Sequence, residues 1–212
     1  VLKAHIVKEI GYKDAVGMDI LMILHQLKIP TVFPDAVLEE AKRVSDVIST
    51  EELEGRVDLR QELTVTIDGA DAKDLDDAVA LVKREDGTFV LTVSIADVSY
   101  YVTENSEMDK EAFERGTSVY LTDRVVPMLP QRLSNGICSL HPYEERLTLT
   151  ARMEIDRSGT IYQHEIFPSV IQSNERLTYD EVNVLFNTNE ASEKITPEIA
   201  EMLWNMKELH TI

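Results

Sequence analysis

Five aspartates lie within ten residues of the sequence, in the segment TIDGADAKDLDD: Asp68, Asp71, Asp74, Asp76 and Asp77. Two carboxylates about 4 Å apart repel each other by roughly 4 kcal/mol at an effective dielectric constant of 20, so several converge only at a cost unless a cation lies between them. Oxygen ligands without a nearby Cys or His favour a hard cation, Mg²⁺ or Mn²⁺, over zinc. The segment is therefore either a site for such a cation or an acidic surface turn whose side chains point apart into water.

The surroundings of the segment favour the cation site. Asp68 ends an alternating apolar stretch, Gly69 permits a sharp bend, and the apolar run AVALV resumes directly after Asp77. Fully extended, the nine steps from Asp68 to Asp77 would span about 30 Å, so the loop must fold back on itself for its carboxylates to share an ion.

Two other acidic motifs fit the segment less well. A calcium EF-hand beginning at Asp68 would place Ala70 and Ala72 at its third and fifth ligand positions. The DxDD pattern of some terpene cyclases belongs to an all-helical, aromatic-rich protein, whereas this segment is strand-rich and aromatic residues are 6% of the chain.

The elements that must position the aspartates are mostly strands. Residues 62–68, 78–82 and 89–97 alternate as strands do, with Asp86-Gly87 as a hairpin turn, and residues 146–155 and 160–171 form a second strand pair around Ser158-Gly159. Helical spacing or capping signals cover residues 18–27, 35–45, 107–115, 178–186 and the segment from 196 onward. The pattern predicts an α+β fold, a mixed and largely antiparallel sheet flanked by helices.

Composition limits the classes of function. The net charge of −18 argues against binding nucleic acid through an overall positive field, but it leaves a metal-mediated site open. No apolar run approaches the roughly 20 residues that span a bilayer, so no membrane partner is expected. The N-terminus has no secretory signal pattern, and the single Cys138 fits a reducing cytoplasm. Both termini look cut, so we expect a fragment of a larger catalytic domain, and nothing predicts an oligomer.

Long stretches of the chain resemble one known family. DLRQELTVTIDGADAKDLDDAVAL, IADVSYYV, ERGTSVYLTDRVVPMLPQRLSNGICSL and RLTY are similar to the catalytic RNB domain of the ribonuclease II/ribonuclease R family, and most similar to its bacterial ribonuclease R branch. The resemblance implies three segments. A terminal strand of a cold-shock barrel would occupy residues 1–10, a helical linker residues 11–55, and the N-terminal half of the RNB catalytic domain residues 56–212.

The resemblance also implies an activity. Members of this family are processive 3′→5′ exoribonucleases that hydrolyse RNA to 5′-mononucleotides with Mg²⁺, by a mechanism in which two metal ions clamp the scissile phosphate. The family's four metal-binding aspartates fall on Asp68, Asp74, Asp76 and Asp77, and Asp71 is not among them. The family's aromatic clamp, which stacks the 3′-terminal base of single-stranded RNA, falls on Tyr120.

The resemblance covers only part of a family member. The family's arginine-rich segment and its C-terminal RNA-binding barrel have no counterpart in the sequence, so we expect the 212-residue chain itself to be inactive. The alternative is a non-catalytic module that binds RNA or metal. Ser134, Cys138 and His141 lie close in sequence but lack a nucleophile motif, and a buried structural cysteine is the expected interpretation.

Overall fold

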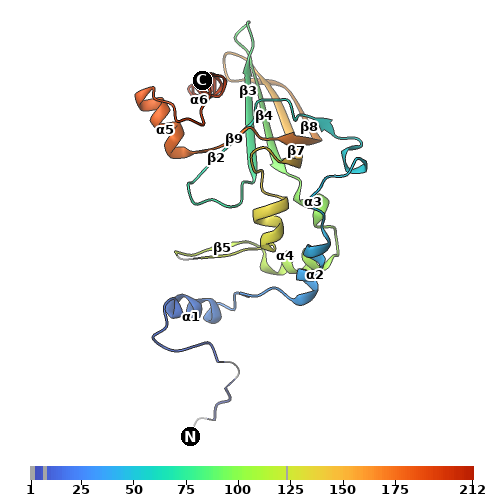
Figure 1. Ribbon diagram of the computed structural model, residues 1–212, viewed down its shortest axis with the longest axis vertical. Coiled ribbons are helices and arrows are strands. Elements are labelled where there is room, and N and C mark those ends of the chain that lie inside the picture. The colour runs from blue at the N-terminus through green and yellow to red at the C-terminus, as the bar shows by residue number, and fades with distance from the viewer. Residues whose placement is uncertain (1–2, 7–8, 123) are drawn as a thin grey trace. The chain divides into compact units, whose positions relative to one another are not determined.

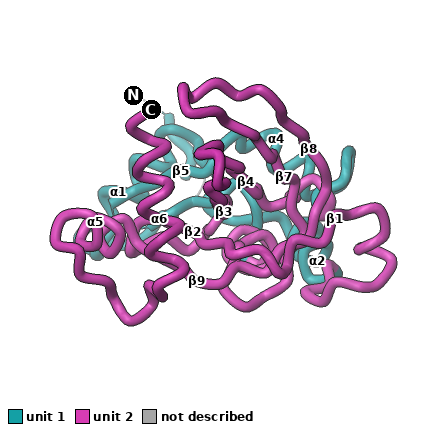
Figure 2. The backbone as a smooth tube through the Cα atoms, turned by 90° about the horizontal axis from the view of Figure 1, so that it is seen from above, with its two compact units in different colours: residues 1–43, 102–131 teal, residues 44–101, 132–212 magenta. Residues whose placement is uncertain are grey.

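The computed structural model describes residues 3–6, 9–122 and 124–212, which form two compact units. Unit 1 comprises residues 1–43 and 102–131, and unit 2 comprises residues 44–101 and 132–212 (Figure 2). This division differs from the predicted boundaries, because unit 1 combines most of the predicted linker with a segment of the predicted catalytic half. The predicted assignment of the three segments stays a prediction.

Unit 2 is built on a seven-stranded sheet with the order β1-β8-β7-β4-β3-β2-β9 (Figure 1). Pairing is antiparallel from β8 through β7, β4 and β3 to β2, and parallel only at the two edges, where β1 pairs with β8 and β2 with β9. The predicted mixed, largely antiparallel α+β fold is confirmed. The strands are β1 Val57–Asp58, β2 Val65–Asp68, β3 Asp77–Lys83, β4 Phe89–Ala96, β7 Glu145–Ile155, β8 Ile161–Gln172 and β9 Glu175–Thr178.

Both predicted hairpins form where a glycine allows a left-handed backbone. Gly87 joins β3 to β4 with φ of 82°, and the Arg84 N–H donates to the Thr88 carbonyl across the turn. Gly159 joins β7 to β8 with φ of 81°, and the Asp156 carboxylate accepts from the backbone N–H groups of Ser158 and Thr160. The two turns set the register of β3 against β4 and of β7 against β8.

Two helices cover the part of this sheet that contains β3, β2 and β9. The helix α5 (Tyr179–Thr188) begins at the predicted capping box, in which Thr178 and Glu181 bond each other's backbone N–H groups, and α6 (Pro197–His210) begins at Thr196-Pro197. Their apolar faces pack on Val65, Leu81 and Phe89 in one buried core. Shorter helical elements are a 3-10 turn at Glu51–Leu53, α3 at Val98–Tyr101 and a π-helical turn at Leu133–Ile137.

Unit 1 contains α1 (Met18–Gln26), α2 (Asp35–Arg43), α4 (Glu107–Arg115) and the small hairpin of β5 (Val119–Tyr120) and β6 (Val125–Val126). As predicted, α4 ends at Gly116, which has φ of 71°.

The terminal strand expected at residues 1–10 cannot be compared along its whole length. Residues 1, 2, 7 and 8 lie outside the described residues, and residues 3–6 and 9–10 have no regular secondary structure. None of the helices in the described part of the chain combines the length and apolar character needed to cross a membrane.

Candidate metal centre

The aspartate segment is the connection between two neighbouring antiparallel strands. Asp68 is the last residue of β2, Asp77 is the first of β3, and the loop of residues 69–76 joins them. Because the two strands pair directly, with Val65 opposite Val79, the chain reverses direction within this loop. The fold-back that an ion site would require is therefore present.

The loop has an apolar anchor among its acids. The Leu75 side chain is fully buried, whereas Asp76 and Asp77 are exposed and Asp74 is half-buried. The Ala96 N–H, at the end of β4, donates to the Asp76 carbonyl at 3.0 Å. The buried Leu75 thus fixes the backbone of the loop between Asp74 and the pair Asp76 and Asp77.

Two of the carboxyls are electrostatically strained. Partial burial raises the pKa of Asp68, and the neighbouring Asp77, Asp76 and Asp74 raise it further, whereas Arg176 lowers it. Asp76 is exposed, but surrounding protein atoms displace part of its hydration, and this loss of hydration raises the pKa of Asp76. The negative charges of Asp74 and Asp77 raise the pKa of Asp76 further. The aspartates are therefore close enough to repel one another.

The donor set fits a hard divalent cation. The Oδ2 atom of Asp68 is buried and has no hydrogen-bond partner in the structure, so one carboxylate oxygen is left for another ligand. Oxygen ligands that carry several negative charges are typical of Mg²⁺ and Mn²⁺ sites. Among the described residues, no three His, Cys, Asp or Glu side chains are already arranged around one ion position. The assignment of Asp68, Asp74, Asp76 and Asp77 as ligands stays a prediction.

The predicted base-stacking residue belongs to the other unit. Tyr120 lies on β5 of unit 1, opposite Val125, and is 65% exposed. An exposed ring is compatible with stacking on a base. The aspartates belong to unit 2, and the role of Tyr120 stays a prediction.

The cysteine is part of a structural turn, as expected. Cys138 is 4% exposed, and burial raises its pKa to about 12, so the thiolate is disfavoured at neutral pH. Ser134 donates to the side chain of Asn135, and the ring Nε2 of His141 contacts the backbone carbonyl of Asn135. These groups bond within their own turn and form no nucleophile and base pair.

Sequence reasoning missed the side chains that support the site from distant segments. Next to Ala96, whose N–H bonds the loop, Asp97 forms a partly buried ion pair with Arg56 at 2.6 Å, and Arg56 also bonds the carbonyls of Thr148 and Ser169. Arg176 and Ser139 bond the aspartate loop itself. The sequence offers one sign of these supports. Ser139 lies in the segment SNGICSL and Arg176 in the segment RLTY, both of which carry the family resemblance.

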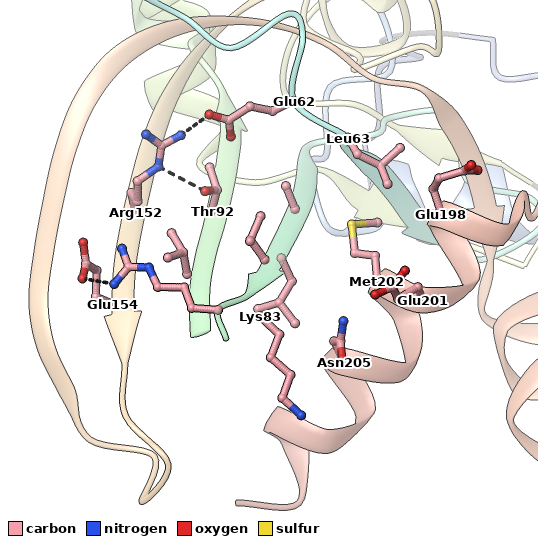
Figure 3. A pocket seen from close by; sticks show the side chains of 15 residues that line it. Glu62, Leu63, Lys83, Thr92, Arg152, Glu154, Glu198, Glu201, Met202 and Asn205 are labelled. Carbon is pink, nitrogen blue, oxygen red and sulfur yellow. Dashed lines mark hydrogen bonds and ion pairs between the residues drawn. The ribbon is translucent and has the colours of Figure 1, made fainter. Parts of the chain in front are cut away.

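A groove of about 630 Å³ lies between the sheet and α6, away from the aspartates, none of which lines it (Figure 3). Its three cations are already paired, Arg152 with Glu62, Arg84 with Glu154 and Lys83 with Glu208. The groove therefore offers no spare positive charge to a phosphate.

Comparison with known proteins identifies relatives along nearly the whole chain. The RNB domain model matches residues 56–212. The chain is 53% identical to ribonuclease R 1 of Lactococcus lactis over 96% of its own length and 25% of that protein. It is 44% identical to ribonuclease R of Thermotoga maritima, over 99% of this chain and 30% of that one. The chain thus spans less than a third of the length of these relatives.

A solved relative shares the fold. RNase R of Mycoplasma genitalium, determined in complex with double-stranded RNA, superposes with a TM-score of 0.89 at 35% identity, over 95% of this chain and 36% of that one. The same protein has been determined with ribose-methylated single-stranded RNA.

Proposed function

Since the chain belongs to the RNB-domain family, in which its relatives are named ribonuclease R, we propose that it carries the metal-binding part of a processive 3′→5′ exoribonuclease that hydrolyses RNA to 5′-mononucleotides. One observation carries the proposal. Within the RNB match, four aspartates surround a sharp reversal between β2 and β3, and one of them has a buried carboxylate oxygen without a hydrogen-bond partner.

The proposed metal ligands are Asp68, Asp74, Asp76 and Asp77, and the proposed cation is Mg²⁺, with Mn²⁺ as a substitute. Two such ions, when bound, would activate the attacking water and stabilise the leaving 3′ oxygen. The chain's own contribution is to hold four carboxylates at one loop against their mutual repulsion and to keep one Asp68 oxygen ready for a ligand.

The proposed substrate is the 3′ end of single-stranded RNA. The relative from Mycoplasma genitalium was determined with RNA, which supports an RNA substrate for the protein that carries this chain. Tyr120 would stack the terminal base, a contact that tolerates any sequence because every base has a π-face. The reduced state expected of Cys138 supports a cytoplasmic location.

The second candidate is a module that binds RNA or metal without catalysis. The chain spans 25% and 30% of the two ribonuclease R relatives, so the remaining RNA contacts and catalytic groups would come from other parts of a longer protein. We therefore expect the 212-residue chain alone to release little or no mononucleotide.

Degradation of a labelled single-stranded RNA by the longer protein that contains this chain separates the two candidates. The proposal expects stepwise release of 5′-mononucleotides from the 3′ end with Mg²⁺, loss of release with EDTA, and recovery when Mg²⁺ is added back. Binding without release would favour the non-catalytic module, and release that persists in EDTA would contradict the metal assignment.

A further inference from the structure

The aspartate loop is held from one side by an arginine of a neighbouring strand. Arg176 lies on β9, opposite Thr66 of β2 in the parallel pair. Its Nη2 donates to the backbone carbonyl of Ala72 at 2.7 Å and to that of Ala70 at 3.1 Å. One guanidinium thus ties the first half of the loop to the edge strand of the sheet.

The second half of the loop is held by the segment that follows the π-helical turn. Ser139 is fully buried, and its Oγ accepts from the Leu75 N–H at 3.0 Å and donates to the Lys73 carbonyl at 3.2 Å. The Leu140 N–H donates to the Leu75 carbonyl at 2.9 Å. The residues on both sides of Asp74 are therefore bonded to one buried hydroxyl.

We propose that Arg176 and Ser139 are positioning residues that hold the aspartate loop in its folded-back form before any cation binds. The inference rests on the metal site proposed above, and it adds two residues that touch neither the cation nor the substrate. They act through the backbone of Ala70, Ala72, Lys73 and Leu75.

The physical need for such a clamp follows from the charges of the loop. Without a cation, repulsion among the aspartates favours an opened loop in which the side chains point apart into water. The hydrogen bonds from Arg176 and Ser139 are formed only when the loop is folded back, so they offset that repulsion in advance. A site organised in advance loses less conformational freedom on binding and therefore binds more tightly.

Charge and clamping have opposite consequences, and this makes the inference testable. Arg176 brings a positive charge to the aspartate loop, because its guanidinium bonds the loop carbonyls of Ala70 and Ala72. As a positive charge alone it would weaken the binding of a cation, so its removal would tighten binding. As a clamp its removal would loosen binding.

The first experiment measures Mn²⁺ binding to the 212-residue chain by electron paramagnetic resonance of the free ion. We expect Arg176→Gln and Ser139→Ala each to raise the dissociation constant at least about tenfold, as the loss of one or two hydrogen bonds predicts. Arg176→Lys keeps the charge, but its ammonium lies one bond short of the position of Nη2, so we expect this variant to bind Mn²⁺ less tightly than the wild type. Arg84→Gln is the matched control and should bind Mn²⁺ as the wild type does, because Arg84 lies just after β3, at the end opposite to the aspartate loop.

The second experiment needs no metal. Hydrogen exchange at the Leu75 amide in EDTA reports whether the loop opens, and Arg176 has no direct contact with that amide. We expect Arg176→Gln to speed this exchange at least about tenfold while exchange in β4 and β7 stays unchanged, which also shows that the variant is folded.

Exchange at Leu75 as slow in Arg176→Gln as in the wild type would overturn the clamp, and so would equal or tighter Mn²⁺ binding by this variant. Faster exchange in a chain whose wild type binds no Mn²⁺ would support the clamp and would overturn the proposed metal site instead.

Discussion

Asp68 and Asp71 differ in their surroundings, although both lie in the acidic segment. Asp68 is partly buried and faces the repulsion of Asp74, Asp76 and Asp77, whereas Asp71 is exposed at the turn. The carboxylate of Asp68 therefore has a free-energy cost in the folded chain, which Arg176 offsets in part and a bound cation would offset further.

A residue-scale prediction follows for the metal-free chain. In EDTA at pH 7, Asp68→Asn should raise the midpoint of thermal unfolding by a few degrees, roughly what a change of about 1 kcal/mol produces in a domain of this size. The matched control Asp71→Asn should leave the midpoint unchanged. Differential scanning calorimetry measures both.

The pH dependence of this effect has a definite sign. The pKa of Asp68 is higher in the folded than in the unfolded chain, so the folded state binds more protons between these two pKa values. The free energy of unfolding therefore falls as pH rises from the unfolded to the folded pKa of Asp68. The advantage of Asp68→Asn should therefore be present at pH 7, shrink as pH falls through the raised pKa of Asp68, and be gone below about 4, where the carboxyl is protonated in both the folded and the unfolded chain. An advantage that grows toward acid pH would contradict the assigned shift.

At the residue scale the sequence shows the ligand candidates but not their supports. The aspartates are contiguous, so their crowding is visible in the sequence. Ser139 contacts Leu75 across 64 positions and Arg176 contacts Ala72 across 104, and only the folded sheet brings such pairs together.

Elements with long periodic patterns or strong turn signals were predictable. The central strands, both glycine hairpins and the capped helices α4, α5 and α6 occur where the patterns place them. The elements that were missed are short. The strands β1 and β9, the hairpin of β5 and β6, and α3 contain two to four residues each, too few to show a period. The parallel pairing of β9 with β2, which brings Arg176 to the loop, has no local signal.

The capping box of α5 gives an element-scale prediction. Thr178 accepts from the Glu181 N–H and also lies opposite Asp68 in the pairing of β9 with β2. Thr178→Ala should lower the free energy of unfolding by about 1 kcal/mol, because the partly exposed start of α5 loses its cap. Urea unfolding measures the change.

Thr178→Ser is the matched control, since it keeps the hydroxyl and should retain most of the stability. Equal urea midpoints for the alanine and serine variants would show that the cap contributes nothing measurable.

At the scale of the whole molecule, unit 1 is stabilised by contacts within that unit, and several of them are made by one arginine. In unit 1 the Arg115 guanidinium lies 3.8 Å from the centre of the Phe33 ring and bonds the carbonyls of Pro30, Val32 and Pro127. Its side chain is 3% exposed and pairs with Glu111. One side chain thus joins α4 to the segments before α2 and after β6.

Arg115→Lys should destabilise unit 1 by about 2–4 kcal/mol, because a lysine keeps the charge but cannot bond three carbonyls or stack its plane on the ring. Hydrogen exchange should become faster in residues 18–43 and 107–126 and stay unchanged in β7 and β8. Arg43→Lys, exposed in the same unit, is the control. Equal acceleration in both units would contradict this local role.

The central claim concerns the longer protein and is tested most directly by Asp76→Asn in that protein, with Asp71→Asn as its control. Release of 5′-mononucleotides from a single-stranded RNA in Mg²⁺ is measured beside the binding of the same RNA. We expect Asp76→Asn to bind RNA but to release no mononucleotide above background, because it would lose one proposed metal ligand, and we expect Asp71→Asn to be active. Release by Asp76→Asn at the wild-type rate would contradict the account.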